Sequence, residues 1–143
     1  MNTISTADQR TILTRLAERI LAYDPAVISE RGLYLSRLAI TDTIGVTLAG
    51  LPEDATQIPL KTPGVATAPG KALVFGTRRR TSALDATFIN GIASHALDFD
   101  DFSSVFGGHQ SVPLVTPLFA LAEERALSGQ DLLTGRLTPR AQF

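Results

Sequence analysis

The sequence predicts a mainly helical, all-α fold, and three observations carry that prediction. Apolar residues make up 44% of the chain and charged residues 19%, a balance typical of a folded globular protein. Apolar residues recur at helical spacing along most of the chain, often behind residues that cap helices. The short apolar run 72–75 is a brief strand or a buried extended segment, and its length does not decide between them.

The first predicted helix begins near Thr6, which has the spacing of a capping box with Gln9. Ile12, Leu16 and Ile20 follow at helical spacing and form an apolar stripe. The N-terminal segment is therefore expected to be an amphipathic helix.

A second helix is predicted from Pro25 to Ala49, because Asp24 can cap it and a proline suits its first turn. Gly32 is expected to weaken or interrupt this helix, and Gly50 is expected to stop it. The expected apolar face includes Leu35, Leu38 and Ala39.

Residues 51–80 are predicted to be a loop-rich connection. Four prolines and two glycines between 51 and 70 favour surface turns. The run Arg78–Arg80 is typical of a solvated surface, although a single arginine there could bind a carboxylate.

A third helix is predicted from Thr81 or Ser82, since Ser82 and Asp85 again have capping-box spacing. Its residues divide into an apolar face (Leu84, Phe88, Ile92 and His95) and small residues that permit close approach by a neighbouring helix (Ala86, Asn90, Gly91, Ala93 and Ser94).

A fourth helix is expected from Pro113 to Ser128. Its inward residues are expected to be Leu114, Leu118, Leu121 and Ala122. Ser128 and Asp131 then open a fifth helix that barely starts.

The segment between the third and fourth helices concentrates the residues that could carry chemistry: His95, Asp98, Asp100, Asp101 and His109. A carboxyl group and a histidine that titrates near neutrality can work as a general acid/base pair. The simpler interpretation is that the aspartates cap or hold the loop through backbone N–H groups and that His95 is a core histidine.

Two other motif interpretations stay open at this point. Asp98–Asp101 matches the acid motif of class II terpene cyclases, but the chain has no Trp and 6% aromatic residues, which is poor for holding a carbocation. A metal site built from the aspartates and His109 is chemically possible for a hard divalent ion, although nothing in the spacing requires it.

Composition excludes several classes of protein. The net charge of −1 gives no electrostatic reason to expect nucleic-acid binding. The absence of Cys excludes disulfides and thiolate sites. The first residues lack the layout of a signal peptide and no apolar run could span a bilayer, so a cytoplasmic protein without membrane contact is expected.

Several blocks, taken in order, resemble the MmgE/PrpD family. They cover nearly everything up to Thr134, and such an ordered series is far more specific than a single motif. The blocks are Asp42–Gly50, Val74–Thr77, Asn90–Asp101, Val112–Glu123 and Ser128–Leu133.

The family includes 2-methylcitrate dehydratase, cis-aconitate decarboxylase and iminodisuccinate epimerase. The resemblance implies that residues 1–134 form the first part of a large helical domain, with the active site in a cleft against a smaller α/β domain. It also implies a homodimer that acts on small polycarboxylates by acid/base chemistry, with no metal or organic cofactor.

The resemblance identifies Asp98 and His109 as the candidate catalytic residues, because Asp98 opens the D-x-D-D stretch and a histidine follows shortly after it. Weaker candidates for substrate binding or loop support are Asp101, Ser103 and His95. Decarboxylase members have a threonine where this chain has Phe102, so the resemblance favours dehydration of the 2-methylcitrate type over decarboxylation.

Residues 135–143 do not continue the resemblance, since Gly135 and Pro139 would break the long helix expected there. The expectation is a chain truncated by a frameshift or an early stop, lacking the later histidine, lysines and tyrosine of the family. Whether the chain alone is an enzyme therefore stays open, and it is expected to be inactive. The alternative is a non-catalytic helical fragment that self-associates through apolar faces.

Overall fold

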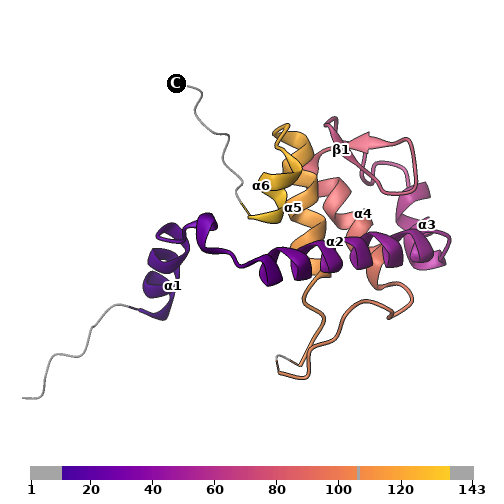
Figure 1. Cartoon of the computed structure of the whole chain (residues 1–143). Helices are drawn as coiled ribbons and strands as arrows, with labels where there is room; N and C mark the ends of the chain where they lie inside the picture. The colour runs from indigo at the N-terminus through magenta and orange to yellow at the C-terminus, as the bar shows by residue number, and fades with distance from the viewer. Residues whose placement is uncertain (1–10, 106, 136–143) are drawn as a thin grey trace, which may run out of the picture.

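The structure, a computed structural model, describes residues 11–105 and 107–135 and is mainly helical, which confirms the predicted fold class (Figure 1). Its helices are α1 (Ile12–Leu21), α2 (Glu30–Gly50), α3 (Asp54–Lys61), α4 (Ala83–His95), α5 (Val112–Glu124) and α6 (Gly129–Leu133). A 3-10 turn, η1 (Pro25–Val27), precedes α2, and a hairpin pairs β1 (Ala72–Leu73) with β2 (Arg80–Thr81).

The body of the molecule is built on α4 and α5, which pack side by side while α2 crosses them (Figure 1). The short helix α3 packs on α4, and β1 lies against α5. The segment between α4 and α5 loops away from this body at one end of the two helices (Figure 1). The candidate site therefore lies where two packed helices end and begin.

The first two helices begin later than predicted. Thr11 caps α1 by accepting a hydrogen bond from the Thr14 amide at 3.2 Å, and the expected Thr6–Gln9 capping box lies outside the described residues. Pro25 opens only the 3-10 turn, and α2 begins after Ser29, which caps the Gly32 amide at 3.1 Å. Gly32 does not interrupt the helix, because it lies within the first turn.

The predicted loop-rich connection contains a helix, α3, that was not predicted because prolines in this segment favour turns. α3 spans Asp54–Lys61 and includes Pro59, and its end charges suit a helix, with Asp54 in the first turn and Lys61 in the last. Thr56 is fully buried and donates a hydrogen bond to the Gly50 carbonyl at 2.9 Å. This tertiary anchor holds a helix whose sequence alone favours turns.

The side of α2 that faces the core carries small and polar residues instead of the predicted leucines. Thr43, Thr47 and Gly50 are buried, whereas Leu35 and Leu38 are about half exposed. Each threonine hydroxyl donates to the carbonyl four residues earlier, so its polar atom is satisfied within the helix. The helix can therefore bury a threonine without leaving a polar group unpaired.

On α4 and α5, too, several of the large apolar residues predicted to form the inward face are exposed. On α4 the buried residues are Ile89 and four of the predicted small residues, whereas Leu84 and Phe88 of the predicted apolar face are 79% and 52% exposed. On α5 the prediction that Leu114 points inward is wrong, because it is 59% exposed, whereas the prediction for Ala122 is confirmed, because it is buried. The buried residues of α5 are Val115, Thr116, Ala120 and Ala122.

Asn90 ties the hairpin region to α4. It is buried, accepts a hydrogen bond from the Phe75 amide at 2.9 Å and donates one to the Leu73 carbonyl at 2.9 Å. Phe75 in turn packs edge-on against Phe119 of α5, with 5.0 Å between ring centroids. The segment predicted as a strand or an extended run is thus a short strand that continues into a buried turn.

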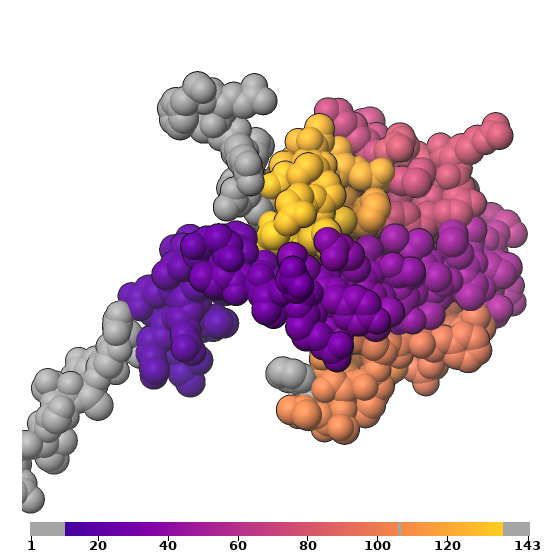
Figure 2. Space-filling view, viewed as in Figure 1, coloured from indigo at the N-terminus to yellow at the C-terminus, as the bar shows by residue number. Residues whose placement is uncertain are grey.

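The last described helix matches its prediction, and α1 lies apart from the body. Ser128 and Asp131 form a complete capping box at the start of α6. Apart from Gly135, the divergent tail lies outside the described residues. Figure 2 shows the indigo α1 projecting from the rest of the molecule. None of the described helices combines the length and the apolar character that crossing a membrane requires.

Candidate active site

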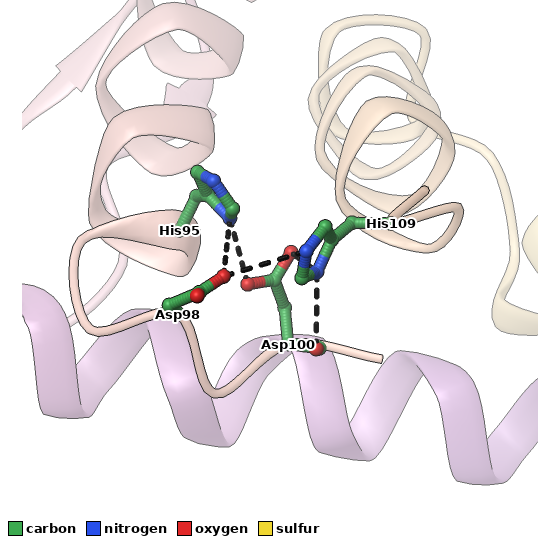
Figure 3. Close-up of side chains that lie close together, drawn as sticks. All are labelled: His95, Asp98, Asp100 and His109. Atoms are coloured by element: carbon green, nitrogen blue, oxygen red, sulfur yellow. Dashed lines mark hydrogen bonds and ion pairs between the residues drawn. The ribbon is translucent and has the colours of Figure 1, made fainter. Parts of the chain in front are cut away.

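The loop that joins α4 to α5 places four ionisable side chains against one another: His95, Asp98, Asp100 and His109, called here the His/Asp cluster (Figure 3). His95 is the last residue of α4, and His109 comes just before α5. The two aspartates lie on the chain between them (Figure 3). Two neighbouring helix ends therefore fix both histidines, and the loop brings the carboxylates between the rings.

Asp98 is held in an unusual backbone conformation that turns the chain out of α4. Its φ is 55°, in the left-handed region that aspartate tolerates better than most residues, and its amide donates to the His95 carbonyl at 3.1 Å. Its side chain is 75% exposed. Asp98 therefore presents a carboxylate to solvent directly beside the two imidazoles.

Asp100 is the buried centre of the cluster, and its side chain is 1% exposed. One carboxylate oxygen, Oδ1, lies 2.8 Å from His95 Nδ1, and the other, Oδ2, lies 3.1 Å from His109 Nδ1. Because it contacts both rings and is inaccessible to solvent, Asp100 is suited to orienting the histidines.

His109 bridges the two aspartates through its two ring nitrogens. Nδ1 lies 3.2 Å from the Asp100 backbone carbonyl, and Nε2 lies 3.4 Å from Asp98 Oδ1. A carbonyl accepts and cannot donate, so the first contact places a proton on Nδ1. Nε2 therefore faces Asp98 as the nitrogen that is free to exchange a proton.

The pKa of His95 is raised above its ordinary value of 6.5. The first cause is the hydrogen bond to Asp100, followed by the charge of the same carboxylate; burial lowers the pKa and the charge of Asp98 raises it. His95 also ends α4, where the helix dipole favours a cation. This ring therefore holds its proton to a higher pH than a free histidine does.

The other residues proposed from the sequence support the loop. Asp101 accepts hydrogen bonds from the Ser111 amide at 3.0 Å and the Ser111 hydroxyl at 2.8 Å, which ties the loop to the N-cap residue of α5. Ser103 pairs through its backbone with Gly108, its amide donating at 3.0 Å. Phe102 packs edge-on against His109, with ring centroids 5.5 Å apart.

An apolar groove opens beside the His/Asp cluster between α4 and α5. Its volume is about 1020 Å³, and it runs from His95, Asp100 and His109 along side chains such as Phe88 and Pro117. In the described part of the chain, the residues that line this groove include no lysine or arginine.

Two residues of the arginine run, Arg79 and Arg80, hold the hairpin in place. Arg79 donates to the carbonyls of Leu60, Val65 and Ala66, and Arg80 donates to the Lys71 carbonyl and pairs with Glu123 at 3.2 Å. These two guanidinium groups therefore connect the β1–β2 hairpin to residues 60–71 and to α5.

Sequence reasoning placed Asp98, His109 and His95 in the site. It named Asp100 in the same segment but gave it no role, although Asp100 contacts both imidazoles. The one feature of the sequence that could have indicated Asp100 is its position, five residues after His95 and one residue before Asp101. The structure brings Asp98 and His109 together, and it places Ser103 in the loop as a backbone tie. As for a metal, the four members of the cluster each offer one ligand atom within 4.8 Å of the others.

A comparison with protein families matches the MmgE/PrpD N-terminal domain to residues 14–138 of the chain. A comparison with curated proteins gave no match. The matched range contains the His/Asp cluster and every helix described above except the first two residues of α1.

Proposed function

Because the chain belongs to the MmgE/PrpD family, we propose that it supplies one wall of a lyase active site for small polycarboxylates. The proposed reaction is a dehydration of the 2-methylcitrate type, with Asp98 and His109 as the acid/base pair. The observation that carries the proposal is the 3.4 Å contact between His109 Nε2 and Asp98 Oδ1 on an accessible face of the loop.

Such a dehydration requires one group to accept a proton and another to donate one. A base removes a proton from the carbon next to a carboxylate, the electron pair forms the carbon–carbon double bond, and the hydroxyl leaves as water after an acid protonates it. A histidine and a carboxylate that share a proton can supply both roles in turn.

Asp100 and His95 support this pair. The buried Asp100 carboxylate and backbone carbonyl both approach His109 Nδ1, which fixes the ring and leaves Nε2 for the substrate. His95, whose pKa is raised by Asp100, favours the charged imidazolium form next to the site more than a free histidine does. Asp100 is therefore proposed as a positioning residue, and His95 as a second proton donor.

The described residues that line the groove provide few cations for a polycarboxylate. Arg79 and Arg80 are engaged by backbone carbonyls, and the groove has no basic residue other than the two histidines of the cluster. We therefore propose that the cations that hold the substrate come from another part of the enzyme. On its own, the 143-residue chain is expected to turn over 2-methylcitrate or cis-aconitate little or not at all.

A chimeric enzyme tests the proposal. Residues 1–134 replace the matching segment of an active 2-methylcitrate dehydratase, and turnover is assayed in EDTA. Asp98→Asn and His109→Gln should each lower kcat by about 100-fold or more. Glu30→Gln removes one negative charge, as Asp98→Asn does, in the first turn of α2, outside the groove lining and the His/Asp cluster, and should leave kcat unchanged. A folded chimera with no turnover, or full activity in the Asp98 and His109 variants, would refute the assignment.

A second candidate function is self-association without catalysis, and the exposed apolar surface of the N-terminal region favours it. Ile12, Leu13 and Leu21 of α1 are each more than 75% exposed. Burying such a stripe against a second copy would remove apolar area from water. Light scattering on the purified chain tests this: a defined dimer supports the candidate, and a monomer at high concentration rules it out.

A further inference from the structure

We propose that the His/Asp cluster is a binding site for a divalent transition-metal ion of the zinc type, which would block the acid/base groups when it binds. These are the same side chains that the proposed function uses. Metal binding rests on their geometry alone, and only the resulting inhibition rests on the proposed function.

The ligand atoms are already close to the spacing that a tetrahedral ion needs. Zinc–ligand bonds of about 2.0–2.2 Å place the ligand atoms of a tetrahedral site roughly 3.3–3.6 Å apart. His109 Nε2 and Asp98 Oδ1 lie 3.4 Å apart, and His95 Nδ1 and Asp98 Oδ1 lie 3.9 Å apart. The 2.8 Å hydrogen bond between His95 and Asp100 would have to open by about half an ångström for the ion to replace its proton.

A second observation comes from Asp100. In the described part of the chain its Oδ2 atom is buried and has no hydrogen-bond partner, although it lies 3.1 Å from His109 Nδ1. A buried carboxylate oxygen without a donor costs free energy, and a cation among the same side chains would offset that cost.

The orientation of His109 also suits a metal ligand. Histidines that bind a metal through one nitrogen usually donate the other N–H to a carbonyl or carboxylate. Here Nδ1 faces the Asp100 carbonyl at 3.2 Å, which leaves Nε2 free to bind an ion. The side chains of His95 and Asp98, 55% and 75% exposed, provide the route of entry from solvent.

The donor set decides the class of ion. Two imidazole nitrogens favour zinc and its neighbours over magnesium and calcium, which prefer oxygen ligands throughout. Two carboxylates also match the double positive charge. We therefore expect Zn²⁺ to bind and Mg²⁺ not to bind.

The metal-free chain can be titrated with ZnCl2 by calorimetry while the imidazole C–H signals are followed by NMR. The chain has two histidines, and both belong to the cluster, so every imidazole signal reports on this site. We expect one Zn²⁺ per chain and a change in both histidine signals, with no change on adding MgCl2. Absence of saturable binding, or a histidine signal that does not move, would overturn the proposal.

Single substitutions distinguish Zn²⁺ binding at the His/Asp cluster from binding at other carboxylates of the chain. Asp98→Asn and His109→Gln should each weaken Zn²⁺ binding by about tenfold or more. Asparagine tolerates the positive φ at position 98, so this variant keeps the turn. Glu30→Gln is the control and should bind as the parent chain does. Equal affinity in parent and Asp98→Asn would contradict the assignment. No substrate is present in these titrations, and the chimera is assayed in EDTA, so either proposal can fail without the other.

Discussion

The crossing of α2 over α4 should be unusually sensitive to a single methyl group at Gly50. A Cβ atom at this position would lie 2.0 Å from the Ala93 carbonyl oxygen and 3.1 Å from the Ala96 Cβ atom. The closest obstacle is backbone, so no rotamer change can relieve the clash, and the two helices must separate. Ala93 lies two residues before His95, and the same crossing therefore positions the candidate site.

The expected cost of Gly50→Ala follows from two opposing effects. Overpacking in a closely packed region costs about 3 kcal/mol when the surroundings cannot yield. Replacing a helical glycine by alanine returns about 1 kcal/mol through helix propensity. The net expectation is a loss of about 2 kcal/mol in the free energy of unfolding.

Gly45 provides a matched control in the same helix. It is exposed in the middle of α2, and a Cβ there would meet no atom within 4 Å. Gly45→Ala should therefore stabilise the chain by about 0.5–1 kcal/mol through propensity alone. Urea denaturation followed by circular dichroism measures both variants. If Gly50→Ala is as stable as Gly45→Ala, the close approach of α2 and α4 is not present.

Three further predictions concern single side chains. Asn90→Ala leaves the buried Phe75 amide and the partly buried Leu73 carbonyl without this partner and should cost about 2–4 kcal/mol in urea denaturation. Asp101→Ala removes both bonds to Ser111 and should cost about 1–2 kcal/mol, and an unchanged midpoint would show that these two bonds are dispensable. Asp100→Asn should bring the pKa of His95 down toward 6.5 in an NMR titration with EDTA. Because the pKa of His95 is raised in the folded chain, the His95–Asp100 pair stabilises the fold most below pH 6.5, and this stabilisation is lost as the pH rises through the raised pKa. If the pKa of His95 does not fall in Asp100→Asn, Asp100 is not the cause of the shift.

Local signals predicted the positions of several helices well. Ser82 caps α4 by accepting a hydrogen bond from the Asp85 amide, and Ser128 forms a full capping box with Asp131 at the start of α6. Both could be predicted because capping depends on residues three apart in sequence. Even so, Asp85 is used differently from a complete box: its carboxylate binds the Ala68 amide and the Thr81 hydroxyl. Ala68 lies 17 residues from Asp85 in the sequence, and no local pattern identifies such a distant partner.

Which face of each helix is buried could not be read from hydrophobicity. α2, α4 and α5 meet through threonine, alanine and glycine, since small residues let the backbones approach closely, while Leu38, Leu84 and Leu114 remain exposed. The helical period locates a stripe of large apolar side chains, but it does not say whether another helix covers that stripe. The inward direction depends on the crossing at Gly50, which is a tertiary contact.

The sequence by itself determined the helical class, the family and the segment that holds the ionisable residues, because these follow from short-range spacing and from ordered blocks. Only the tertiary structure decided that Asp100 is the buried partner of both histidines and that Asp101 binds Ser111 at the start of α5. The physical reason is that neighbouring aspartates are equivalent in a linear pattern, whereas packing α4 beside α5 brings His109 back to the end of α4 and encloses one carboxylate between two rings.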